Sequence, residues 1–130
     1  MSQSLLRYSL LFGVVLFCTM AIAHFLGLKY PLLFVYFDTP FYAYQDKIIA
    51  FTLVTYACFF YSASRVPQVM PAVLLALTVT VLGLCAINVS PALAEVLQGR
   101  PTTAYWAQTG VFAGYLLWLA FLYLRSRQAP

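Results

Sequence analysis

Four polar side chains stand out in an otherwise apolar sequence, and they are the residues best suited to chemistry: His24, Asp46, Asn88 and Gln108. The imidazole of His24 can gain or lose a proton near neutral pH, so a carboxylate beside it would form a proton-exchanging pair. Asp38 and Asp46 are the two candidate partners, and Asp46 is preferred because it begins a predicted helix and must lie near the bundle. The amides of Asn88 and Gln108 would add hydrogen-bonding groups.

The positions of these side chains depend on the predicted helices that carry them. The ionisable residues divide the chain into four apolar segments, each close to the roughly 20 residues that a helix needs to cross a bilayer. The predicted membrane spans are residues 6–28, 46–64, 69–89 and 104–124.

Each predicted span brings one of the four polar residues to a similar depth, near what we expect to be the outer end. Polar groups inside a membrane are costly, so each needs a partner or a task. One hypothesis is that they form an outward-opening polar pocket. The alternative is structural: the four side chains satisfy each other and hold the helix ends together. Asp46 has a further structural reading as a helix N-terminal cap.

The composition supports a membrane protein of one domain, residues 1–130. The sequence is 64% hydrophobic and 8% charged, with a mean hydropathy of +0.89, whereas soluble domains carry roughly 25% charged residues. We therefore expect an all-α polytopic membrane protein, with four transmembrane helices in an antiparallel bundle. The segment Ala21-Ile22-Ala23 matches a signal-peptide cleavage pattern, but the apolar run continues beyond it, so we expect the first span to be retained.

An aromatic stretch from Lys29 to Lys47 separates the first two spans, and it contains two prolines and seven aromatic residues. Tyrosine rings prefer the membrane–water boundary, where the ring leaves water and the hydroxyl stays wet. This stretch is predicted to be an interfacial loop that covers the polar pocket as a lid. The lid residues are Tyr30, Asp38, Tyr42 and Tyr44.

The basic residues favour one orientation. With four spans, Arg7, Arg65, Arg125 and Arg127 fall on one side, and Lys29, Lys47 and Arg100 fall on the other. The positive-inside rule counts Lys and Arg, so both termini are expected to be cytoplasmic in a bacterial inner membrane.

Two segments of the second half carry local signals. Ser90 can cap a short helix that starts at Pro91 and ends at Gly99, which would form the second outer connection. Gly110 and Gly114 form a Gly-x-x-x-Gly pair, which lets two helix backbones approach closely. That approach could occur within the bundle or between two copies of the chain.

Several classes of function find no support in the sequence. The basic residues are scattered and form no stripe that could track nucleic acid. The three cysteines, Cys18, Cys58 and Cys85, are not spaced as Cys-x-x-Cys, so no zinc site is predicted. They are expected to be buried thiols. His24 is the only histidine, so one chain cannot supply two imidazoles to haem, and no cofactor is expected.

The sequence therefore favours a small, non-catalytic integral membrane protein. It would be an accessory subunit of a larger complex, or a binder of lipid or of another hydrophobic ligand at the polar pocket. One alternative is a small oligomeric transporter or channel subunit that self-associates. A second alternative is a membrane enzyme that uses His24 with a carboxylate.

Overall fold

The computed structural model describes residues 2–28 and 42–128, and every regular element in these ranges is helical. The elements are α1 (Ser2–Leu26), α2 (Ala43–Arg65), the 3-10 turn η1 (Pro67–Val69), α3 (Met70–Asn88), α4 (Pro91–Leu97) and α5 (Thr103–Gln128). The helices α1, α2, α3 (with η1) and α5 are long and apolar enough to span a membrane, which agrees with the four predicted spans.

The helix boundaries follow local sequence signals. Gly27 has a φ of +66°, and the N–H of Leu28 bonds to the carbonyl of Ala23 at 2.9 Å, which closes α1 with a Schellman turn. The predicted short helix is present as α4, and the Ser90 hydroxyl accepts the N–H of Leu93 at its start. The prediction for the second span began three residues late, because α2 starts at Ala43 inside the aromatic stretch.

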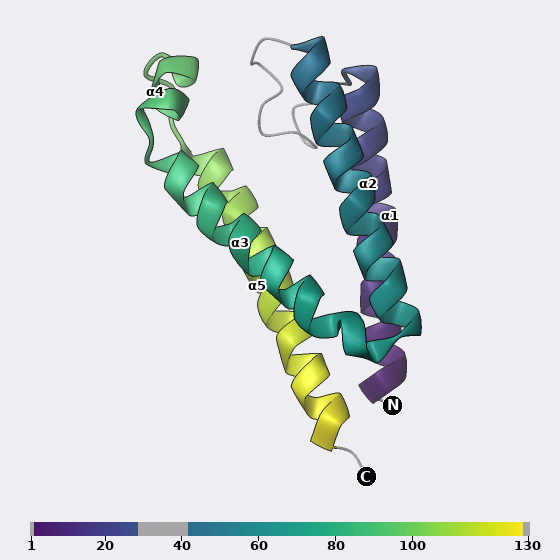
Figure 1. The fold of residues 1–130 in the computed structure, drawn as a ribbon. Coiled ribbons are helices and arrows are strands. Elements are labelled where there is room, and N and C mark those ends of the chain that lie inside the picture. The colour runs from purple at the N-terminus through teal and green to yellow at the C-terminus, as the bar shows by residue number, and fades with distance from the viewer. Residues whose placement is uncertain (1, 29–41, 129–130) are drawn as a thin grey trace.

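The four long helices form two pairs, α1 with α2 and α3 with α5 (Figure 1). The pairs meet at the end of the molecule that carries Arg7, Arg65, Arg125 and Arg127, which we call the arginine end. They diverge toward the opposite end, which carries His24, Asp46 and Asn88 and which we call the histidine end (Figure 1). Between the pairs, α1 packs against α5 and α2 packs against α3.

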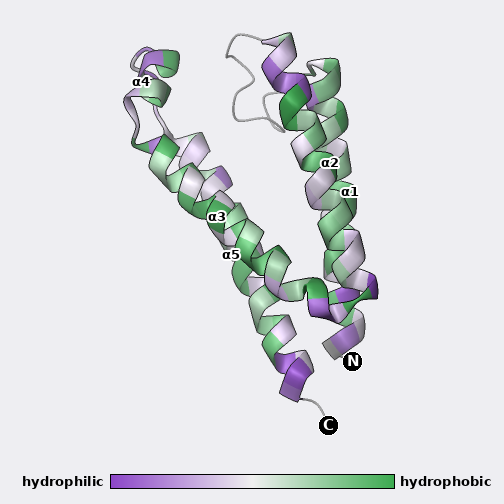
Figure 2. Cartoon of the chain, in the orientation of Figure 1, coloured by the Kyte–Doolittle hydropathy of each residue, from purple (hydrophilic) through white to green (hydrophobic). Residues whose placement is uncertain are grey.

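Hydropathy follows the same axis. Figure 2 shows that hydrophobic residues cover the middle of the long helices, while hydrophilic residues lie mainly near the helix ends, and that α4 carries both kinds. Large apolar side chains remain exposed along the helix exteriors, such as Phe12, Leu75 and Val111. A surface of this kind matches a hydrocarbon surrounding.

The hydrophobic core extends from the arginine end to the middle of the bundle. Its largest fully buried side chains are Phe17, Phe60, Leu10, Met70, Leu77, Leu119, Leu122 and Val73. Phe17 lies at the centre of the aromatic part of this core, with ring centroids 5.2 Å from those of Tyr56 and Phe60. Rings at this separation contribute attraction beyond the area they bury.

Gly13 lets the first helix approach that core. A Cβ atom built on Gly13 would lie 2.5 Å from Cδ1 of Phe60 and 2.5 Å from the hydroxyl oxygen of Tyr115. Only glycine fits in this position, since real Cβ atoms do not approach other atoms so closely. The ring of Tyr115 stacks on Phe60 at 5.8 Å, and its hydroxyl donates to the carbonyl of Ser9 at 2.7 Å.

One expectation about the cysteines is wrong. Cys18 and Cys85 are partly buried, but Cys58 is exposed. Cys58 follows the buried Ala57 on α2, and a step of one residue turns a side chain by roughly 100° around the helix axis. This rotation carries Cys58 away from α1 and toward the exterior.

Candidate functional site

His24 and Asp46 form a direct contact at the histidine end. The Nδ1 atom of His24 lies 3.0 Å from Oδ1 of Asp46, and both side chains are largely buried between α1 and α2. This carboxylate is the partner that the sequence favoured for His24. When the carboxylate is ionised, Nδ1–H donates to it, which fixes the tautomer and the orientation of the ring. Such a pair can hold a proton at a defined position.

The second oxygen of Asp46 is also used. Oδ2 accepts the backbone N–H of Tyr42 at 3.2 Å, and Tyr42 is the N-cap residue of α2. A carboxylate in the first turn also interacts favourably with the positive end of the helix. The capping role and the histidine contact therefore coexist in Asp46, one on each oxygen.

Asn88 has a different partner, on the other helix pair. Its side-chain nitrogen donates to the Thr109 hydroxyl at 2.9 Å, and that hydroxyl donates to the carbonyl of Tyr105 at 3.0 Å. Asn88 and Thr109 are both buried. Gln108 lies beside Thr109 in the chain and is only half-buried. The sequence analysis missed Thr109, since it considered Gln108 alone as the polar residue of α5.

The structure thus brings His24 together with Asp46, and Asn88 together with Thr109, but on separate helix pairs. Because the pairs diverge toward the histidine end, these two contacts do not meet in one pocket among the described residues (Figure 1). Asn88 and Thr109 cross-link α3 and α5, and His24 and Asp46 cross-link α1 and α2.

Half of the predicted lid residues lie within the part of the chain that the structure describes. Tyr30 and Asp38 lie outside the described residues. Tyr42 and Tyr44 belong to the start of α2 rather than to a loop, and their side chains are exposed. The covering of His24 by the aromatic stretch stays a prediction.

The two glycines of α5 make no close contact with the described residues of the other helices. A Cβ atom built on Gly110 or Gly114 would meet no described atom within 4 Å, and both glycines are exposed. Close packing of this pair within the bundle is therefore contradicted. Gly13 on α1 fills that role instead. The alternative of self-association through Gly110 and Gly114 stays a prediction.

Two grooves lie beside α2. One, of about 480 Å³, lies between α2 and α3, and its lining includes Thr52, Thr55 and Phe59. The hydroxyls of Thr52 and Thr55 donate to carbonyls of their own helix. Tyr56 also lines this groove, and its hydroxyl bonds to that of Thr80 at 2.6 Å, which joins the two helix pairs.

The second groove, of about 250 Å³, follows the contact between α1 and α2, and we call it the α1–α2 groove. Its lining is entirely apolar: Ala21, Ile22, Phe25, Leu26, Ala50, Phe51 and Val54. Ala21 lies one turn from His24, and Ala50 lies one turn from Asp46, so the groove runs up to the histidine–aspartate pair. The ammonium of Lys47 lies 5.2 Å from the ring centroid of Phe25, at the same end.

No group of three or more His, Cys, Asp or Glu side chains within residues 2–28 and 42–128 could hold a metal ion. Comparison of the chain with protein-family models, with curated proteins and with solved structures gives no match.

Proposed function

We propose that the chain is a non-catalytic integral membrane protein of four antiparallel transmembrane helices that binds a lipid-like amphiphile at its histidine end. The observation that supports this proposal is the α1–α2 groove, an apolar channel that ends beside polar groups. Its lining covers about one and a half turns of each helix, which suits part of an acyl chain, and Lys47 with the His24–Asp46 pair suits a polar head. Ligand sites typically combine an apolar lining with a few fixed polar groups in this way.

Two features distinguish the groove from an ordinary lipid-facing surface. The alanines at its floor, Ala21 and Ala50, are buried, so the groove is a hollow formed by small side chains between larger ones such as Ile22 and Phe51. The polar groups at its end are fixed by contacts within the protein rather than by the ligand. A preformed site of this kind loses little conformational freedom when it binds.

Photo-crosslinking tests the proposal. A fatty acid with a diazirine in its chain is added to the purified protein in nanodiscs, and the labelled residues are mapped by mass spectrometry. We expect labelling to concentrate on residues 21–26 and 50–54. The variant Val54→Trp fills the groove and should lose this labelling, because Val54 is 45% exposed and the indole can enter the hollow without disturbing the core.

The matched control is Val79→Trp, which places the same ring on α3 at a position that is 61% exposed and outside both grooves. It should leave the labelling pattern unchanged. Labelling spread evenly over all exposed helix faces, or unchanged by Val54→Trp, would contradict the proposal.

An accessory role in a larger membrane complex is compatible with this site and stays a prediction. It is tested by purification of a tagged chain from native membranes in mild detergent. A partner recovered in fixed ratio with the chain would support it, and recovery of the chain alone would count against it.

One observation favours a second candidate, a small oligomeric transporter or channel subunit. The exposed pair Gly110 and Gly114 has open space beside it in a membrane-spanning helix, and such pairs allow two helices to pack closely. Crosslinking in nanodiscs should then give a defined oligomer that Gly114→Leu abolishes. A monomer in both proteins would leave this candidate without support.

A further inference from the structure

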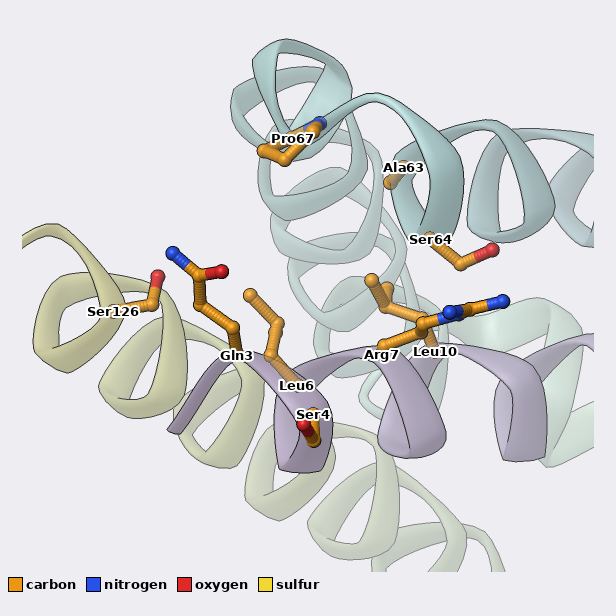
Figure 3. Close-up of a pocket in the computed structure, with 9 residues that line it drawn as sticks. All are labelled: Gln3, Ser4, Leu6, Arg7, Leu10, Ala63, Ser64, Pro67 and Ser126. Atoms are coloured by element: carbon orange, nitrogen blue, oxygen red, sulfur yellow. The ribbon is translucent and has the colours of Figure 1, made fainter. Parts of the chain in front are cut away.

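A second hollow lies at the arginine end, far from the α1–α2 groove. It encloses about 260 Å³ between the first turns of α1, the last turn of α2 with η1, and the last turns of α5 (Figure 3). We call it the arginine-end cavity.

The lining of the arginine-end cavity is rich in groups that can donate hydrogen bonds. Arg7, Gln3 and Ser4 come from α1, Ser64 from α2 and Ser126 from α5. Figure 3 shows the amide of Gln3 directed toward Ser126 and the guanidinium of Arg7 directed toward Ser64. No acidic residue is among the described residues that line it. A donor-rich site with a cation and no carboxylate favours an anion.

Arg7 differs from the other arginines at this end. The guanidinium groups of Arg65, Arg125 and Arg127 each lie about 6 Å from the centroid of a nearby tyrosine or phenylalanine ring. Within the described part of the chain, the one ion pair joins His24 and Asp46, so Arg7 has no carboxylate partner there.

Two further features raise the positive potential at the cavity. The first turn of α1 supplies Gln3 and Ser4 and contains no acidic residue, so the positive end of the helix dipole is not neutralised there. The other three arginines lie at the same end of the molecule (Figure 1). The hydroxyls of Ser64 and Ser126 donate to the carbonyls of Tyr61 and Tyr123, and rotation would redirect them to a ligand.

We propose that the arginine-end cavity binds a phosphate group, with Arg7 as its main ligand and the neighbouring Ser64 hydroxyl as an additional donor. Guanidinium matches phosphate geometry through two parallel hydrogen bonds. The floor of the cavity is apolar, since Leu6, Leu10 and Ala63 are buried there, so a phosphate attached to a lipid fits it as well as a free one. The cavity shares no residue with the α1–α2 groove, so the two proposals fail independently.

Native mass spectrometry of the full chain tests the site. The protein is loaded with phosphatidylglycerol or with phosphatidylcholine, and the bound lipid is counted. The variant Arg7→Gln should lower the affinity for phosphatidylglycerol about tenfold, as expected for loss of a hydrogen bond between charged groups. Arg7→Lys keeps the charge but loses the planar fork, so it should retain part of the affinity.

The matched control is Arg127→Gln, which removes the same charge from the same end, where the guanidinium lies over the Tyr123 ring and does not line the cavity. It should change the affinity less than twofold, because a screened charge outside the site contributes little. Equal losses in Arg7→Gln and Arg127→Gln would overturn the proposal and indicate general surface charge. No loss in Arg7→Gln would also overturn it.

A second arm distinguishes the source of the phosphate. Inorganic phosphate is added to the delipidated protein at constant ionic strength, and the melting temperature is measured against chloride. Stabilisation that disappears in Arg7→Gln would assign a soluble phosphate to the cavity. Stabilisation by phosphatidylglycerol alone, again dependent on Arg7, would assign the lipid headgroup. Stabilisation by neither would overturn the proposal.

Discussion

The arginine end and the histidine end are held together in different ways. At the arginine end, four long helices share one core in which Phe60 stacks on Tyr115 and packs at a tilt on Phe17, and Gly13 fits beside the Phe60 ring and the Tyr115 hydroxyl. At the histidine end the helix pairs diverge, and each is joined by one buried polar contact. Lipid is as apolar as a leucine side chain, so close packing and hydrogen bonds, rather than hydrophobic burial, drive helix association in a membrane.

The tightly packed core and the α1–α2 groove that a ligand could reach therefore lie toward different ends of the molecule. The packed end fixes the relative positions of the helices. Toward the divergent end, a groove between the pairs, along α2 and α3, opens to the side, and the α1–α2 groove opens beside it. Substitutions at the two ends should therefore change the free energy of unfolding by different amounts.

The largest effect is expected for Gly13→Leu. The added side chain would overlap the rings of Phe60 and Tyr115, and overpacking of this kind costs roughly 3 kcal/mol of unfolding free energy. The matched control is Gly114→Leu, which makes the same change in open space and should stay within about 0.5 kcal/mol. Both values can be measured by denaturant titration in mixed micelles. Similar losses in the two variants would refute the packing described for α1.

Asp46→Ala should weaken the histidine end alone. The change removes the acceptor for His24 and for the N–H of Tyr42, and loss of a buried acceptor costs about 1–3 kcal/mol. Hydrogen exchange should accelerate at the start of α2 and the end of α1, but not at Phe60 or Leu119 in the core. Glu95→Ala on α4, at an exposed position, serves as the control. Faster exchange throughout the molecule would show that the two ends are not independent.

Asn88→Ala should have a smaller effect. It removes the bond to Thr109, and hydrogen bonds between membrane helices contribute about 0.6 kcal/mol on average. The Thr109 hydroxyl keeps its bond to the carbonyl of Tyr105 in the variant, which limits the loss. Gln108→Ala should change the stability less than Asn88→Ala, and the reverse order would contradict the assignment of Thr109 as the partner.

The smallest expected effect is the coupling free energy between the His24–Asp46 contact and the Asn88–Thr109 contact. In the double variant Asp46→Ala with Asn88→Ala, the losses should add to within about 0.5 kcal/mol, as expected for sites without shared partners. A larger coupling energy would show that the residues interact in one shared site, as the first hypothesis from the sequence held. The same denaturant titrations provide this measurement.

Much of the helical fold could be predicted from the sequence, because apolar segments of the right length are separated by charges, prolines and turn residues. His24 contacts Asp46, the carboxylate that the sequence favoured, while Asp38 lies outside the described residues. The sequence did not predict which face of each helix is buried. Thr109 rather than Gln108 meets Asn88, and Gly13 rather than Gly114 lies in the core.

These errors have a common physical cause. A helix that faces lipid on one side and protein on the other is apolar all round, so its hydrophobic pattern does not mark the buried side. Gln108 and Thr109 differ by roughly 100° around the helix axis, and only the packing of α3 on α5 decides between them. The divergence of the helix pairs depends on side-chain volumes across four helices, which sequence spacing does not report.

The hydrogen bond from Tyr115 to Ser9 joins the first long helix to the last one described. α1 is synthesised long before α5, so the space beside Gly13 that the hydroxyl of Tyr115 occupies stays unfilled until the last long helix has been made. A chain cut short before residue 103 would keep Gly13 and Phe17 beside Phe60 but would lack the hydrogen bond that fastens α1 to α5.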